Sequence, residues 1–239
     1  MGNSGYVPYE LLKLIESSNN LIISHGLLNA DDNTSFNITN NGNLKRIMIG
    51  NNCFEKARVF ELDGLSELES VVIGESFRNR SSERIDGSFR IVNCPTLKSI
   101  QIGGNTPIWM GGNAFPDYNT LELNNLPSLQ SISIGNNCFG KVRVFELEGL
   151  NELESVVIGG GSFRISDKER NDGSYRVANC PKLESIQIGE ESFMDYHSFE
   201  LNNLPSLQSI DIDGKNYNTN GCFNWAPLFS LTGLIDGLV

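Results

Sequence analysis

The sequence LNNLPSLQSISIGNNCF, from Leu123 to Phe139, contains the pattern on which the rest of the chain is built. Its apolar residues follow the spacing L-x-x-L-x-x-I-x-I-x-x-N-x-F, in which Asn137 occupies the polar position. The first ten residues return unchanged at Leu201–Ile210. A motif that recurs along one chain predicts a solenoid, in which each unit buries its apolar edge only against its neighbours.

Copies of this pattern can be aligned along most of the chain, with a basic unit of 24 residues and insertions in three units. They begin at Leu44, Leu68, Leu97, Leu129, Leu153, Leu183 and Leu207, and a ragged additional copy begins near Leu21. Residues 47–74 recur almost unchanged at residues 132–159. This longer repeat indicates a duplicated block of three units within one domain.

Each unit is expected to contain two short strands. The first is the Ile-x-Ile-Gly segment, as at Ile132–Gly135, where alternation points every second side chain inward. The second is Phe-x-Leu-x-x-Leu, as at Phe145–Leu150. Gly or Asn precedes its last leucine, as at Gly149 and Asn203, which suits a corner that needs a positive φ. No helical period appears inside the units, so the fold class is a mainly β repeat solenoid.

The pattern L-x-x-I-x-I-x-x-N-x-F resembles the conserved segment of leucine-rich repeats. The form with Phe after the strand and without a helix is similar to the BspA-like leucine-rich repeat family, over roughly residues 21–234. Ser76, Gly161 and Glu191 stand where Asn52 and Asn137 sit, so the expected asparagine ladder is incomplete. The resemblance implies a right-handed superhelix of two short parallel strands per coil, used to bind proteins or cell surfaces, without specifying the ligand.

The two ends are expected to differ from the repeats. Residues 1–20 are predicted to form an N-terminal cap with a short helix, because apolar residues line one side of the segment after Pro8. Residues 21–239 are predicted to form a solenoid of about eight coils. The last residues, Ile235–Val239, resemble the opening of another strand, so we expect either that the natural chain continues past Val239 or that a second copy covers this end.

Composition excludes some classes of partner. The net charge of −11 argues against nucleic acid, whose binding surfaces are basic. No stretch approaches the ~18 consecutive apolar residues of a transmembrane helix. The chain begins without the apolar core of a signal peptide, although a mature secreted fragment with an added Met would look the same.

The five cysteines are expected to be reduced. Cys53 and Cys138 hold equivalent places three units apart, as do Cys94 and Cys180, and three coils span about 14 Å at ~4.8 Å each. A disulfide requires Cα atoms within about 7 Å. Reduced thiols favour an intracellular location, and the localisation stays open.

No catalytic or cofactor chemistry is indicated. The two histidines, His25 and His197, have no partner cluster, and no Ser/His/Asp elbow, P-loop or paired-cysteine metal spacing appears. We therefore expect neither an enzyme nor a bound cofactor.

Two surfaces are candidates for binding. On the first strands, small uncharged residues including Ser131, Ser133 and Ser155 form a flat outward ladder, which could serve only the structure or could accept a partner. The insertions are the second candidate, because recognition residues are often found on loops. One insertion contains Trp109 and Met110, and the alternative is that this loop folds back over the edge of the solenoid. Another insertion contains the basic residues Arg164, Lys168 and Arg170.

The outward ladder of the second strands has a simpler interpretation. It alternates mostly in sign, and we expect ion pairs between stacked strands that set their register. Its residues are Glu61, Arg90, Glu122, Glu146, Arg176 and Glu200.

The sequence thus predicts a non-enzymatic module that binds a protein or cell-surface ligand. The alternative is a structural protein that stacks end to end, with its C-terminal end as a homo-oligomer interface.

Overall fold

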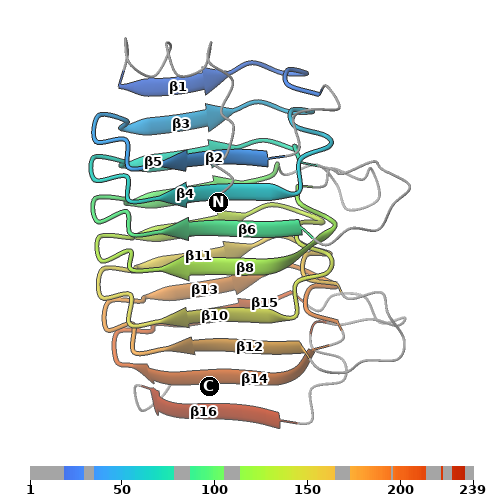
Figure 1. The fold of residues 1–239 in the computed structure, drawn as a ribbon. Helices are drawn as coiled ribbons and strands as arrows, with labels where there is room; N and C mark the ends of the chain where they lie inside the picture. The colour runs from blue at the N-terminus through green and yellow to red at the C-terminus, as the bar shows by residue number, and fades with distance from the viewer. Residues whose placement is uncertain are drawn as a thin grey trace, which may run out of the picture.

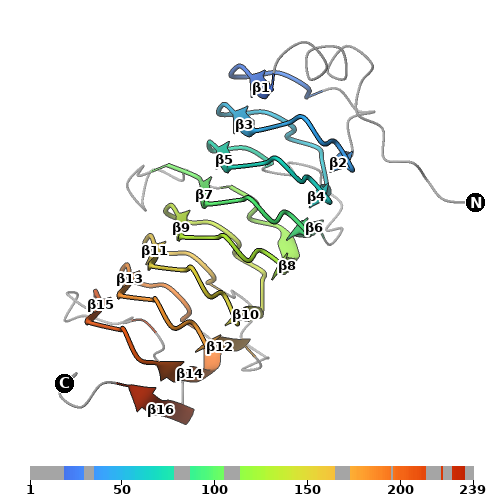
Figure 2. The ribbon, with the colours of Figure 1, turned by 90° about the vertical axis from the view of Figure 1, so that its left-hand side faces the viewer.

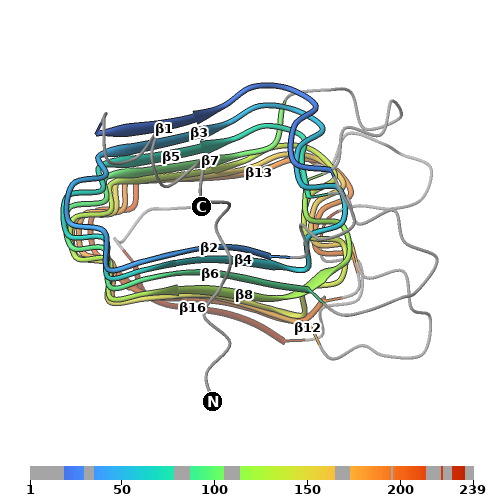
Figure 3. The same ribbon diagram turned by 45° about the horizontal axis from the view of Figure 1, so that its top comes forward.

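The structure is a computed structural model, and it describes residues 19–29, 35–77, 87–104, 114–164, 173–194, 196–213, 222 and 228–234. Within these ranges every regular element is a strand, and the strands alternate between two layers along the chain. Figure 1 shows the resulting stack, and Figure 3 shows the two layers facing each other across the core. This arrangement is a repeated parallel β solenoid.

The first layer is one continuous parallel sheet of eight strands, made of every odd-numbered strand in sequence order. Its strands are β1 (Asn20–Ile23), β3 (Arg46–Ile49), β5 (Ser70–Ile73), β7 (Ser99–Ile102), β9 (Ser131–Ile134), β11 (Ser155–Ile158), β13 (Ser185–Ile188) and β15 (Ser209–Ile212). Register is constant, so equivalent residues of successive units lie opposite each other, as Ile132 lies opposite Val156. Each strand begins one residue before the predicted segment and ends before its glycine.

The second layer consists of two separate four-stranded parallel sheets. The first sheet of this layer contains β2 (Ser35–Thr39), β4 (Val59–Asp63), β6 (Gly87–Val92) and β8 (Tyr118–Asn124). The second contains β10 (Val144–Glu148), β12 (Gly173–Ala178), β14 (Tyr196–Leu204) and β16 (Leu228–Leu234). In Figures 1 and 2 the ribbons of β8 and β10 lie farther apart than those of β6 and β8. The second layer is therefore interrupted between β8 and β10.

The core lies between the two layers and follows from alternation along the strands. In β9 and β11 the isoleucines and valine that point inward are buried, while the intervening residues face outward. Leucines at the corners, such as Leu129 and Leu153, are fully buried. Burial of about 25 cal/mol per Å² of apolar surface drives this packing, and it accumulates coil by coil.

Aromatic rings form a continuous stack on one side of the core. Consecutive rings lie 4.7–5.6 Å apart between centroids, and the rings of each successive pair are nearly parallel. We call this the phenylalanine stack: Phe54, Phe77, Phe115, Phe139, Phe163 and Phe193. All six have a positive φ, between 51° and 59°. The stack places one aromatic ring from each of six successive units in the core.

A second aromatic stack, on the strands of the second layer, is interrupted. Phe60 stacks on Phe36 and on Phe89 with centroid distances of 5.2 and 4.8 Å. Beyond the break, Tyr175 stacks on Phe145 and on Phe199 at 5.1 and 4.9 Å. The strand between these two runs is β8, which carries Leu121 opposite Phe89. The missing ring coincides with the end of a sheet.

The corners confirm the predicted left-handed residues. Positive φ occurs at each position where Gly or Asn precedes the last leucine or cysteine of a unit: Gly64, Asn93, Asn125, Gly149, Asn179, Asn203 and Gly233. Asparagine and glycine adopt this conformation with the least steric cost. These residues turn the chain at the C-terminal end of seven of the eight second-layer strands, and Asn40, also with a positive φ, follows β2.

Ser76 does not occupy the place of Asn52, contrary to the sequence alignment. Its unit is one residue shorter at this turn, and Ser76 takes the buried place held by Cys53, Ser162 and Ser192. There its hydroxyl accepts a hydrogen bond from the Cys53 amide at 3.0 Å and donates one to the Gly50 carbonyl. The predicted cap at residues 1–20 lies outside the described residues apart from Asn19 and Asn20, and Ile235–Val239 lies wholly outside them.

Candidate functional site

The outward side of the eight-stranded sheet is the candidate binding surface, and we call it the first-layer face. One of its ladders consists of Asn20, Arg46, Ser70, Ser99, Ser131, Ser155, Ser185 and Ser209, and the other of Ile22, Met48, Val72, Gln101, Ser133, Val157, Gln187 and Asp211. The charged residues of these ladders are Arg46, next to one end of the sheet, and Asp211, at the other end. The constant register of the sheet makes the middle of the face flat and uncharged.

The predicted serines lie together at the centre of this face. Ser131 and Ser133 lie on β9, and Ser155 lies opposite Ser131 on the adjacent strand β11. All three are half-buried. Among the described residues no hydrogen bond uses their hydroxyl groups, so these groups are available to an external donor or acceptor. Val157, beside Ser133, adds an exposed apolar side chain.

The basic insertion can be placed only at its first residue. Arg164 follows the phenylalanine stack at Phe163, and its guanidinium lies 3.0 Å from the carboxylate of Glu191 in the next unit. The structure therefore places Arg164 away from the serines, at a turn between the layers. Trp109, Met110, Lys168 and Arg170 lie outside the described residues.

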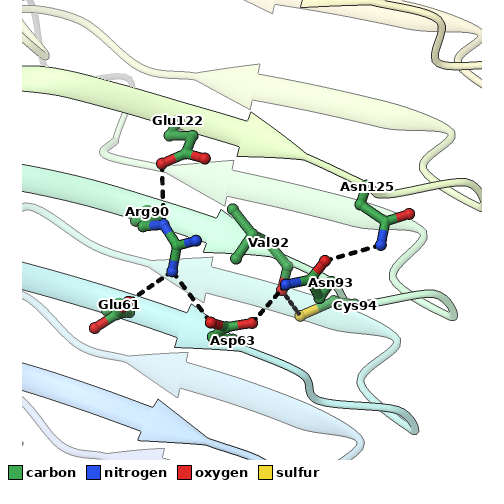
Figure 4. A network of polar contacts seen from close by, with 8 residues as sticks. All are labelled: Glu61, Asp63, Arg90, Val92, Asn93, Cys94, Glu122 and Asn125. Carbon is green, nitrogen blue, oxygen red and sulfur yellow. Dashed lines mark hydrogen bonds and ion pairs between the residues drawn. The ribbon is translucent and has the colours of Figure 1, made fainter.

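The outward side of the second layer is occupied by internal ion pairs. Arg90 on β6 contacts Glu61 on β4 at 2.7 Å and Glu122 on β8 at 2.9 Å, and it also reaches Asp63 at 3.2 Å (Figure 4). Asn93 donates to Asp63 at 2.8 Å and accepts from Asn125 at 2.8 Å. Four of these six residues are charged, yet each bonds another member of the network.

The duplicated block repeats this network. Arg176 on β12 contacts Glu146 at 2.9 Å and Glu200 at 3.4 Å, and it also pairs with Glu148. Asn179 donates to Glu148 and accepts from Asn203 at 2.7 Å. Each network contains one arginine and three carboxylates, so both leave a surplus of negative charge. The predicted ion pairing is confirmed within each block.

These contacts shift the pKa of one carboxyl in each network. A hydrogen bond from Asn93 lowers the pKa of Asp63 below its ordinary value of 3.8, against the effect of partial burial and with help from Arg90. A hydrogen bond from Asn179 lowers the pKa of Glu148 below 4.5 in the same way, with help from Arg176. Both carboxyls are therefore firmly ionised at neutral pH, as structural partners of an arginine.

The buried thiols have no features of reactive groups. Burial raises the pKa of Cys138 to about 12 and raises the pKa of Cys94, Cys180 and Cys222. The thiolate is the nucleophilic form, so such thiols react slowly. All five cysteines are free. His25 accepts a hydrogen bond from the Asn51 amide at 2.9 Å, and the described residues contain no group of three metal-binding side chains.

Sequence reasoning missed part of the second-layer networks. Asp63 and Glu148 stand two residues after Glu61 and Glu146, which is the spacing that places them on the same face of a strand. That spacing could have revealed them. The corner asparagines that continue each network are harder to find, because the positive φ of the corner already explains Asn93 and Asn179.

Comparison with protein-family models, with curated proteins and with solved structures found no match. In the described part of the chain no helix has the length and apolar character needed to cross a membrane. The assignment of the chain to a repeated parallel β solenoid thus rests on the repeat in its sequence and on the register of its strands.

Proposed function

We propose that the protein is a non-enzymatic recognition module that binds a protein or cell-surface ligand on its first-layer face. In this proposal the solenoid is a right-handed leucine-rich repeat of about eight coils that resembles the BspA-like family. The observation that carries it is the contrast between the two outer faces. At the centre of the first-layer face Ser131, Ser133 and Ser155 present hydroxyl groups that bond no described residue, whereas the charged groups of the two second-layer networks are bound to one another.

The chemistry of the first-layer face fits a protein partner. Ser131, Ser133 and Ser155 can donate and accept hydrogen bonds, and Val157 contributes apolar area beside them. Protein interfaces combine an apolar centre with about one hydrogen bond per 100–200 Å². The flat sheet also holds these groups at fixed positions, which reduces the entropy lost on binding.

Site-specific photo-crosslinking tests this proposal. A photoreactive amino acid replaces Ser133 in one protein and Ser198, on the second-layer strand β14, in a matched control. Both proteins are exposed to the same cell extract and surface fraction, and crosslinked partners are identified by mass spectrometry. The proposal expects a discrete partner at position 133 that is absent at position 198.

The partner is then purified and its affinity is measured. Ser131→Arg and Ser155→Arg place bulky charges in the centre of the face, and each is expected to weaken binding at least tenfold. The control Ser198→Arg should leave the affinity unchanged. Equal crosslinking at positions 133 and 198, or full affinity in Ser131→Arg, would move the binding site away from this face.

A second candidate function is end-to-end assembly. The observation that favours it is the C-terminal end of the described solenoid, where Leu231 on the outermost strand β16 is half exposed and Ile210 and Ile212 on β15 are only partly buried. Outermost strands carry backbone groups that can pair with another chain. Sedimentation over a wide concentration range should then show oligomers that Leu231→Lys disperses, and a monomer at all concentrations would exclude assembly.

A further inference from the structure

The boundary between the two duplicated blocks divides the second layer, and we call it the seam. On one side β8 ends the sheet of the first block, and on the other β10 begins the sheet of the second block. The first layer is continuous at the same level, where β7 pairs with β9 and β9 with β11. The seam is therefore an interruption of one wall, and both of its strands present an unpaired edge.

Apolar side chains in the seam are not fully covered. Leu121 and Leu123 on β8 point toward the core but are only partly buried, whereas their counterparts Phe89 and Ile91 on β6 are fully buried. Solvent thus reaches these inward leucines at mid-molecule. Val144, the first residue of β10, faces outward and is half exposed.

The two ends of the seam differ. At one end the neighbouring units are joined, because Lys141 pairs with Asp117 and the rings of Phe115 and Phe139 stack at 5.2 Å. At the other end Gly149 has open space around it, since an added Cβ would meet no atom within 4 Å. At the equivalent corner Gly64, an added Cβ would lie 2.6 Å from Asn40. The seam is closed at the Asp117 end and open at the Gly149 end.

In the outward ladder of the described second-layer strands, no arginine stands between the two glutamates that flank the seam. Within each block every outward glutamate of the ladder neighbours an arginine, in the order Glu61, Arg90, Glu122 and again Glu146, Arg176, Glu200. Across the seam Glu122 is followed by Glu146, and like charges on neighbouring strands repel. A strand that carried a basic residue between them would restore the alternation.

The chain itself shows which sequence fills such a place. Between two glutamate strands stands Phe89-Arg90-Ile91 in the first block and Tyr175-Arg176-Val177 in the second. In both, an aromatic and a β-branched residue point inward and the arginine points outward. The seam has no such strand, which would place a ring opposite Leu121, a cation opposite Glu122 and backbone groups against the two unpaired edges.

We propose that the seam binds an extended peptide segment of a partner protein with the pattern apolar-basic-apolar. The segment adds as a parallel strand between β8 and β10, a recognition mode in which backbone hydrogen bonds give affinity and alternate side chains give specificity. Its apolar residues cover Leu121 and Leu123, and its arginine or lysine bridges Glu122 and Glu146. A full strand needs two spacings of about 4.8 Å between its neighbours, so binding widens the seam from its open end.

A labelled synthetic peptide with the sequence of residues 173–179, Gly-Ser-Tyr-Arg-Val-Ala-Asn, tests the proposal on the intact chain. Fluorescence anisotropy should show saturable binding that weakens with added salt. The double variant Glu122→Gln with Glu146→Gln should bind about tenfold more weakly. Glu154→Gln with Glu184→Gln removes the same charge from turns of the other layer and should bind like the natural chain. A peptide with Glu in place of its arginine should bind more weakly than the parent peptide.

Hydrogen exchange on the natural chain locates the peptide without any variant. Protection gained on β8 and β10 supports the seam. Protection gained instead on the outer strands β2, β15 or β16 would overturn it. The middle outward residues of these strands are Asn37, Asp211 and Ser230, which do not form a pair of glutamates, so binding there would show that the peptide adds to any exposed strand edge. Absence of saturable binding, or equal affinity for both double variants, would also overturn it. This site lies on the layer opposite the first-layer face, so the two proposals fail independently.

Discussion

At the scale of single residues, the phenylalanine stack holds six bulky side chains in a backbone conformation that such residues rarely adopt. A left-handed residue costs roughly 1–2 kcal/mol. Each ring of the stack is buried, and each stacked aromatic pair contributes about 0.5–1.5 kcal/mol beyond its burial. The burial and stacking of each ring therefore offset the cost of the left-handed conformation at the same residue.

Phe145 tests the packing of the second aromatic stack. Its ring is fully buried and lies 5.1 Å from Tyr175 and 5.2 Å from Phe163. Phe145→Ala should lower the free energy of unfolding by about 3–5 kcal/mol, because a cavity remains. Leu121→Ala is the matched control and should cost less, since Leu121 is already partly exposed. Chemical denaturation measures both, and equal losses would show that the seam is packed like the rest of the core.

Asn93 tests the corner and its network together. Asn93→Ala should destabilise the protein by roughly 1–2 kcal/mol, because alanine must adopt a positive φ. Asn93→Gly removes the same hydrogen bonds to Asp63 and Asn125 but relieves the backbone, so it isolates the contribution of the network. If both variants unfold at the same denaturant concentration, the left-handed corner contributes nothing.

The two lowered carboxyl pKa values predict how stability depends on pH. Asp63 and Glu148 titrate at lower pH in the folded chain than in the unfolded chain. Their contribution is therefore complete above the unfolded pKa values and is lost as the pH falls through the folded ones. The unfolding free energy should decrease below about pH 5, and it should decrease less steeply in Asp63→Asn with Glu148→Gln. Parallel curves for the two proteins would contradict this account.

At the scale of strands and turns, a buried tyrosine braces each block. Tyr118 donates a hydrogen bond to the Ala57 carbonyl at 3.0 Å, and Tyr196 donates to the Val142 carbonyl at 2.6 Å. Each ring passes over a glycine of the intervening strand, and an added Cβ on Gly87 would lie 2.8 Å from the Tyr118 ring. The brace explains why β6 and β12 begin with glycine.

Gly87→Ala should therefore destabilise the protein by about 1–3 kcal/mol, since the alanine methyl group overlaps the ring. Gly42→Ala is the matched control, because its Cβ would lie at an ordinary 3.6 Å from Ser66. Thermal unfolding of the two variants checks the prediction. A smaller effect at Gly87 than at Gly42 would mean that Tyr118 does not pack against this strand.

Most of the strands and corners could be predicted from the sequence, because they depend on residues that are close together in the chain. Alternation such as Ile132-Ser133-Ile134 predicts a strand, and Asn125 or Gly149 before a leucine predicts a left-handed corner. The braces depend on atoms brought together by stacking, as Tyr118 and Ala57 are, and a single unit does not reveal them. The left-handed phenylalanines were also missed, since their side chain argues against that conformation.

The seam was missed for a different reason. Leu121 fits the apolar pattern of the second strand as well as Phe89 does, so the missing ring has no signal in the binary pattern. The adjacent glutamates Glu122 and Glu146 were visible but were interpreted as one exception in a ladder that mostly alternates. Whether β8 pairs with β10 depends on the missing aromatic ring and on the repulsion between the two glutamates together. The sequence alone does not show how large each effect is. Of the candidate binding residues, the serines could be assigned to one face because strand register is regular.

At the scale of the whole molecule, the chain contains two copies of a three-unit block, whose strands pair across the block boundary only in the first layer. In a solenoid the stability is approximately a sum of unit and interface contributions. The interface between the blocks has a continuous first layer and phenylalanine stack but an unpaired second layer. We therefore expect this interface to be the weakest one inside the array, and the proposed peptide site in the seam depends on it.

Hydrogen exchange of the free protein tests this division most directly, because it reports each strand separately. The account predicts strong protection throughout β7, β9 and β11, which pair on both sides, and strong protection in β4, β6 and β12. In β8 and β10 the amides that face the seam should exchange much faster. Uniform protection of β8 and β10 at the level of β6 would contradict the divided second layer, and loss of protection in β9 would contradict the continuous first layer.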